Sequence, residues 1–207
     1  MAQVNDLVNR TLAAATDAPE PLAVEAYITS AREFFTNTGL WRMDIESFEA
    51  TGTDGDYTIS TGKPDEEVYD LTFVQNNDTR LLRSNLERVY RERTRPGEPR
   101  YYAVKIGGVA AFAPTGITPE NLTAIGVVRP SIQALDIDDD IVATYHTVIE
   151  QGAMAYLFML PNQSWTSPEV GSAYRQTFIA AMDDFIARAV HSGTDDVPRR
   201  APIVRGT

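Results

Sequence analysis

The sequence from residue 101 to residue 113 reads YYAVKIGGVAAFA. Two runs of apolar and β-branched residues flank the pair Gly107-Gly108. Glycines at both central positions permit the primed turn that joins two antiparallel strands tightly. We therefore predict a β-hairpin here, and this hairpin places β structure in the middle of the chain.

Further strands are expected on both sides of this hairpin. Several short segments alternate apolar and polar residues or are rich in β-branched and aromatic residues, and turn residues bound them. These segments are 41–48, 57–60, 68–74 and 122–128. Between them, Ser84 is a candidate cap for a short basic helix that stops at Arg95-Pro96-Gly97. The region from about residue 41 to residue 135 is therefore predicted to be rich in β structure.

Both ends of the chain have helical spacing instead. In residues 1–40 apolar residues recur every three or four positions, with a break at Pro19 and Pro21 and a glycine stop at Gly39. The same spacing returns in residues 139–191, where Ser167-Pro168-Glu169 is a strong signal for the start of the last helix.

This order of elements predicts an α+β fold. We expect one domain over residues 1–207, with a helical bundle formed by the N-terminal and C-terminal helices (1–40 and 139–191). A β-rich layer (about 41–135) is inserted between them. The last residues, 192–207, are rich in Gly, Asp, Pro and Arg, and we expect an extended C-terminal arm there.

Composition excludes several classes of protein. The chain has 207 residues, of which 43% are apolar, and this is enough for a substantial core. The absence of cysteine excludes a disulfide scaffold, thiolate zinc sites and thiol catalysis. No apolar run approaches the roughly 20 residues that span a bilayer, and the first residues lack a signal-peptide pattern. We expect a soluble protein made in the cytoplasm, with no membrane partner.

The charge of the chain is uneven. The formal net charge is −11, but the window from Arg80 to Lys105 holds eight basic and three acidic residues. A basic patch on an acidic remainder suits pairing with other copies of the chain or with an acidic neighbour. A solvated arginine-rich helix and loop is the plain alternative. The arginines we predict to make such contacts are Arg83, Arg88, Arg91, Arg93 and Arg95.

Each catalytic or ligand-binding pattern that we tested lacks an essential part. The acidic run 136–140 does not continue as a calcium loop, because Ile141 and Thr147 stand where a glycine and an acid are needed. His146 and Glu150 have the spacing of a surface pair on one helix. We therefore expect no catalytic residue, no cofactor and no metal site. Pairs of carboxylates that only folding brings together are not excluded by the sequence.

Several segments resemble one family along nearly the whole chain. They are Ala31–Trp41 (AREFFTNTGLW), Val128-Arg129-Pro130, Gly152–Pro161 (GAMAYLFMLP), Trp165 and Tyr174–Phe178 (YRQTF). In this order they resemble the head-to-tail adaptor (connector) proteins of tailed bacteriophages, which dock beneath the portal and receive the tail.

This resemblance implies a structural role in the virion neck, without catalysis. It implies a ring of twelve copies that docks on the portal protein and joins a tail tube, nozzle or tail-terminator protein, and viral DNA would pass through the ring without specific contacts. It makes the arginines named above either subunit-interface or DNA-channel residues. The C-terminal arm would then contact the portal through Arg199, Arg200, Ile203, Val204 and Arg205.

Three other functions remain open from the residues alone. The nearest is a tail-tube or nozzle protein of the same virion. A small carboxylate-dependent enzyme and a module that binds a partner without forming a ring belong to different classes.

Overall fold

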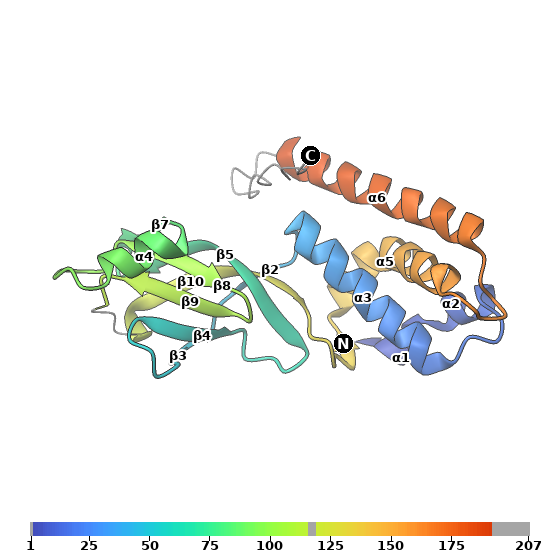
Figure 1. Cartoon of the computed structure of the whole chain (residues 1–207), viewed down its shortest axis with the longest axis horizontal. Coiled ribbons are helices and arrows are strands. Elements are labelled where there is room, and N and C mark those ends of the chain that lie inside the picture. Colours follow the sequence, from blue (N-terminus) through green and yellow to red (C-terminus); the bar gives the residue numbers. More distant parts are fainter. Residues whose placement is uncertain (1, 116–118, 192–207) are drawn as a thin grey trace.

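The structure is a computed structural model that describes residues 2–115 and 119–191. Within these residues the chain forms six α-helices and three β-sheets, which gives an α+β protein. Figure 1 shows an elongated molecule with the helices at one end and most of the strands at the other. We call these the helical part and the β part.

The helical part combines elements from both ends of the chain. Its helices are α1 (Val4–Leu7), α2 (Asn9–Ala14), α3 (Glu20–Thr38), α5 (Asp139–Met159) and α6 (Pro168–His191). A small sheet beside them pairs β1 (Ala2–Gln3) with β11 (Asp136–Ile137). The predicted stop of α3 is confirmed, since Gly39 has a left-handed φ of 63° and donates its N–H to the carbonyl of Phe35.

Aromatic side chains fill the core of the helical part. The ring of Phe34 lies 5.2 Å from that of Tyr145 on α5 and 5.7 Å from that of Phe185 on α6, measured between centroids. Trp41 packs on Phe35 at 5.2 Å and is buried. These contacts hold α3, α5 and α6 together through edge-to-face and tilted aromatic pairs, which add to the free energy of apolar burial.

The β part consists of two sheets. One has the order β2 (Arg42–Asp44), β10 (Leu122–Pro130), β5 (Glu66–Asn76), β6 (Thr79–Arg80), and its neighbouring strands are antiparallel. The other has the order β3 (Ser47–Ala50), β4 (Asp56–Ser60), β9 (Val109–Ala113), β8 (Tyr101–Lys105), β7 (Leu82–Arg83). The hairpin predicted from residues 101–113 is confirmed as β8 and β9. A helix, α4 (Leu86–Glu92), and a short 3-10 turn (Pro119–Asn121) complete this part.

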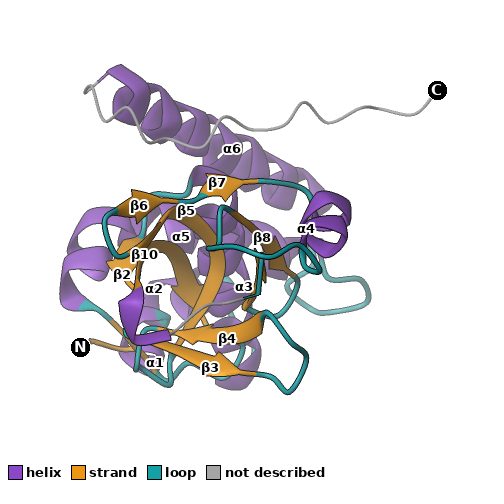
Figure 2. Cartoon of the chain, turned by 90° about the vertical axis from the view of Figure 1, so that its left-hand side faces the viewer, coloured by secondary structure: helices purple, strands orange, loops and turns teal. Residues whose placement is uncertain are grey.

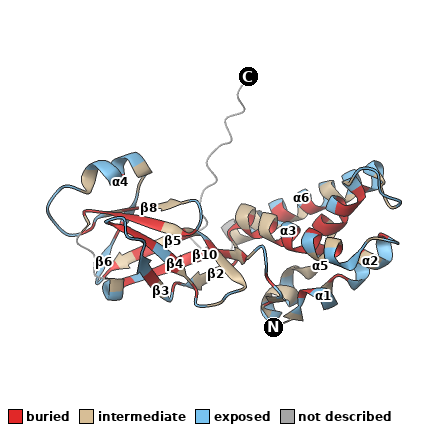
Figure 3. Ribbon diagram, turned by 60° about the horizontal axis from the view of Figure 1, so that its bottom comes forward, coloured by how far each residue is buried: buried red, intermediate tan, exposed pale blue. Residues whose placement is uncertain are grey.

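The two sheets enclose a core of their own. Val68, Leu71 and Val74 of β5 are buried in the same apolar cluster as Ile59 of β4 and Phe112 of β9. Figure 2 looks onto this end of the molecule and Figure 3 shows buried residues along the strands. The β part is therefore stabilised by apolar contacts that are separate from the aromatic core of the helices.

The predicted architecture of a helical bundle with one inserted β-rich layer is wrong. The chain forms three sheets, and two of them make a β part with its own core. The alternation of apolar residues predicts strands but not which strands become neighbours, and β10 lies between β2 and β5, far from both in sequence. The predicted C-terminal arm, 192–207, lies outside the described residues.

Within the described ranges, no helix has the length and apolar character needed to cross a membrane.

Candidate functional site: an arginine surface on the β part

The basic window 80–105 covers one side of the β part. It contains β6, β7, α4 and β8, and Figure 1 shows α4 and β7 along the upper edge of the β part, opposite β3 and β4. The helix α4 begins at Asn85, whose side chain accepts a hydrogen bond from the backbone N–H of Arg88 at 2.9 Å. The cap predicted at Ser84 is therefore one residue too early. Val89 is buried against a small alanine-rich cluster of β8 and β9, which leaves Arg88 and Arg91 exposed.

Arg93 and Lys105 bind the same buried carboxylate. Both donate to Asp56, a residue that is 4% exposed, and both lie over the ring of Tyr90, at 4.6 and 5.1 Å from its centroid. Burial lowers the pKa of Lys105, but the hydrogen bonds to Asp56 and Tyr90 and their charges outweigh it, so the pKa is raised. This cluster fastens α4 to the sheet. Arg93 therefore stabilises the fold, and its side chain is too little exposed to contact another protein or DNA.

The other four predicted arginines reach the surface. Arg83 forms an ion pair with Asp70 at 2.7 Å, and Arg95 forms one with Glu92 at 2.6 Å. The guanidinium of Arg88 stacks on the ring of Tyr101 at 4.1 Å and donates to its hydroxyl at 2.8 Å. We define Arg83, Arg88, Arg91 and Arg95 as the arginine surface.

Two further arginines extend this surface. Arg80 lies over the ring of Phe73 at 5.3 Å, and Arg100 is exposed between α4 and β8. The sequence indicated their charge but gave no sign of which basic residues in the window would be buried. That distinction depends on Asp56, the partner of Arg93 and Lys105, which lies outside the window.

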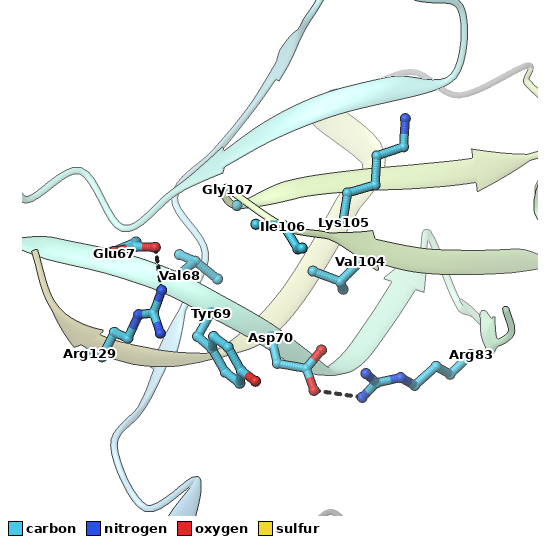
Figure 4. A pocket seen from close by; sticks show the side chains of 11 residues that line it. Glu67, Val68, Tyr69, Asp70, Arg83, Val104, Lys105, Ile106, Gly107 and Arg129 are labelled. Carbon is cyan, nitrogen blue, oxygen red and sulfur yellow. Dashed lines mark hydrogen bonds and ion pairs between the residues drawn. The ribbon is translucent and has the colours of Figure 1, made fainter. Parts of the chain in front are cut away.

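A shallow hollow of about 210 Å³ lies where this surface meets the centre of the molecule. Figure 4 shows it between two ion pairs, Arg83 with Asp70 and Arg129 with Glu67, beside the turn that carries Ile106. Arg32 of α3 also binds Glu67 at 2.7 Å. Burial raises the pKa of Glu67, but the hydrogen bonds and charges of Arg129 and Arg32 outweigh it, and the pKa is lowered below its ordinary value. Each of the two carboxylates in the hollow therefore has an arginine partner.

The surface pair predicted for His146 and Glu150 is wrong. The Nδ1 atom of His146 shares a hydrogen bond of 2.9 Å with the hydroxyl of Tyr27, and Glu150 is 2% exposed. Arg10 of α2 reaches Glu150 at 3.3 Å from the surface. Burial, with the charge of Glu150 as a second cause, raises the pKa of Tyr27.

Acidic residues dominate the helical part. Residues 2–41 and 136–191 contain thirteen Asp and Glu and four Arg, and no Lys. Within the described ranges, no group of three or more His, Asp or Glu is placed to hold a metal ion. The predicted portal-contacting residues Arg199, Arg200, Ile203, Val204 and Arg205 lie outside the described residues.

Comparison of the sequence with protein-family models and with curated proteins found no match in either set.

Proposed function

We propose that the chain is the subunit of a head-to-tail adaptor ring of a tailed bacteriophage, which docks on the portal and joins it to the tail around the DNA channel. The observation that carries this proposal is the arginine surface on one side of the β part, in a chain that is acidic elsewhere: residues 42–135 hold fourteen Asp and Glu and eleven Lys and Arg, and eight of those eleven lie in the window 80–105. The β part presents exposed arginines, whereas the helical part is strongly acidic.

Separated charge supports a ring for a geometric reason. Subunits of a closed ring contact each other head to tail, so one surface of a copy meets a different surface of the next copy. Opposite charges on the two surfaces favour this contact and disfavour contact between like surfaces. The planar guanidinium of arginine forms two parallel hydrogen bonds with a carboxylate, which adds geometric specificity.

The acidic balance of the chain supports the passage of DNA. Proteins that neutralise many phosphates bind DNA tightly, whereas a channel must let the duplex move. A net charge of −11 is compatible with a channel wall that does not hold the phosphate backbone. The arginine surface then faces either the next subunit or the DNA at a few points.

The first experiment tests assembly. The purified full-length protein is mixed with portal rings from several tailed bacteriophages and followed by sedimentation and negative-stain electron microscopy. We expect a second ring stacked on the portal of at least one phage, and deletion of residues 192–207 should weaken it. A protein that stays monomeric with every portal, at every concentration tested, would overturn the proposal.

A variant of the arginine surface tests its role in that assembly. Replacing Arg88, Arg91 and Arg95 together with Glu should abolish the ring, because the contact surface changes sign. Replacing the same three residues with Lys is the matched control and should preserve most of the assembly. Arg93 is left unchanged, since its pair with Asp56 is buried and its loss would disturb the fold. Equal assembly by the Glu and Lys variants would exclude these arginines from the interface.

A further inference from the structure

The helical part and the β part meet at a junction where Met43 of β2 packs against the apolar core of the helical part. Trp41, which follows α3, and Val128, in β10, are both buried in the core of the helical part. The N–H of Val128 donates to the carbonyl of Trp41 at 2.8 Å. We call these two residues the pivot, because chain segments of both parts touch there.

Around the pivot several polar contacts converge on one carboxylate, and a separate ion pair joins Lys63 of the β part to Asp138 of the helical part at 3.7 Å. Glu67 of β5 accepts from Arg32 of α3 and from Arg129 of β10, each at 2.7 Å. Arg32 also donates to the carbonyl of Pro130 at 2.6 Å, and Arg129 donates to the hydroxyl of Thr36 on α3 at 3.1 Å. We call Arg32, Thr36, Glu67 and Arg129 the Glu67 clamp. Figure 4 shows the Glu67–Arg129 side of it.

The clamp joins α3 to the two central strands of one sheet through charged groups that water reaches. The side chains of Arg32, Glu67 and Arg129 are 16%, 30% and 19% exposed. The Nε atom of Arg129 is buried and has no hydrogen-bond partner among the described residues. Two guanidinium groups thus share one carboxylate, and one donor of the set stays unsatisfied, which costs free energy in this arrangement.

In the second chain segment that crosses the junction, Ala134 is buried but the two large apolar residues are exposed. Ile132 and Leu135 lie between β10 and β11 and are 74% and 73% exposed. The segment is held to the β part by Asp65, whose carbonyl accepts from Ser131 at 2.8 Å and whose side chain accepts from Leu135 at 2.7 Å. Polar junctions between compact parts permit relative motion, whereas large apolar interfaces oppose it.

We propose that this junction is a hinge, and that the Glu67 clamp sets the angle between the helical part and the β part. When the clamp is released, the β part rotates about the pivot while both cores stay intact. The proposal does not depend on ring assembly, since it concerns the geometry of a single chain.

The test measures a distance across the hinge. The chain contains no cysteine, so Thr58→Cys on β4 and Gln176→Cys on α6, both exposed, accept spin labels at two defined sites. Double electron–electron resonance then gives the distribution of distances between the two parts. We expect one narrow peak for the parent protein and a broadened or shifted distribution for Glu67→Gln and for Arg32→Gln.

The matched control lies on the same strand. Asp70→Asn breaks the Arg83–Asp70 ion pair, which joins β5 to β7 within the β part and does not cross the junction. It should keep the narrow peak. Circular dichroism shows that each variant is folded before its distances are compared. A broad distribution in the parent protein would show that the Glu67 clamp does not set the angle. A narrow and unshifted peak in both clamp variants, or equal broadening by Asp70→Asn, would overturn the hinge.

Discussion

Arg93, just after α4, and Asp56, at the start of β4, form a buried ion pair across thirty-seven residues of chain. Lys105 of β8 binds the other oxygen of the same carboxylate. The helix α4 buries one residue, Val89, so its apolar contact with the sheet is small. The position of α4, and with it that of Arg88 and Arg91, therefore depends on this pair.

Removing the carboxylate should destabilise the protein strongly. We expect Asp56→Ala to lower the free energy of unfolding by about 3 kcal/mol, because two partly buried cations lose their partner. Glu92→Ala, which breaks the exposed pair with Arg95, should cost less than about 1 kcal/mol. Urea unfolding of the two variants measures both values. Equal costs would show that the buried pair does not hold α4 in place.

Assembly carried by opposite charges should weaken as salt is added. Raising the ionic strength from about 0.05 M to about 0.5 M shortens the screening length to a few ångströms, and contacts between exposed charges lose most of their energy. We expect the bound fraction in sedimentation with portal rings to fall over this range. An apolar contact would be unchanged or strengthened by the same salt, and that result would argue against the arginine surface as the main interface.

Removing Arg10 alone should cost more stability than removing the charges of both Arg10 and Glu150. Arg10→Ala leaves a buried carboxylate without its charged partner, and we expect a loss of about 2 kcal/mol. Adding Glu150→Gln to that variant removes the uncompensated charge and should recover part of the loss. Urea unfolding of the two single variants and the double variant forms a double-mutant cycle. Additive effects would mean that the two side chains do not interact.

The Glu67 clamp should contribute stability only while Glu67 is ionised. Its pKa is below the ordinary value of 4.5 because Arg129 and Arg32 stabilise the carboxylate more than burial destabilises it. A lowered pKa adds stability above the unfolded-state pKa, and this stability is lost as the pH falls through the folded-state pKa. We expect the difference in unfolding free energy between the parent protein and Glu67→Gln to be constant from neutral pH to about pH 5 and to shrink below about pH 4. A difference that is the same at pH 3 and pH 7 would contradict this.

Local signals in the sequence predicted local structure well. The hairpin at residues 101–113, the stop of α3 at Gly39 and the start of α6 at Pro168 are all confirmed. The connection of the hairpin differs from the two-residue turn predicted at the glycine pair, because Lys105 pairs with Val109 and three residues, 106–108, lie between them. Each depends on a few neighbouring residues whose backbone preferences are strong. The cap of α4 was misplaced by one residue because Ser84 and Asn85 are both good caps, and propensity alone does not choose between them.

Long-range partners were not predictable from the same signals. Nothing near Asp56 indicates that it binds Arg93 and Lys105, and nothing near Glu150 distinguishes a buried carboxylate from an exposed one. The order of strands in the two sheets depends on contacts between residues far apart in the chain. The charge of the basic window 80–105 could therefore be predicted, but which of its arginines are exposed could not.

The β part and the helical part differ in whether they are formed by one continuous stretch of the chain. The two sheets of the β part are built from one continuous stretch, 42–130, whereas the helical part needs α3 from one end and α5 and α6 from the other. A chain that leaves the ribosome from its N-terminus can complete its two sheets before α6 exists. Until then Phe34 of α3 lacks the rings of Phe178 and Phe185 that cover it. The nascent protein therefore carries an uncovered aromatic face during most of its synthesis, and α6, which emerges after both sheets and α5, closes it.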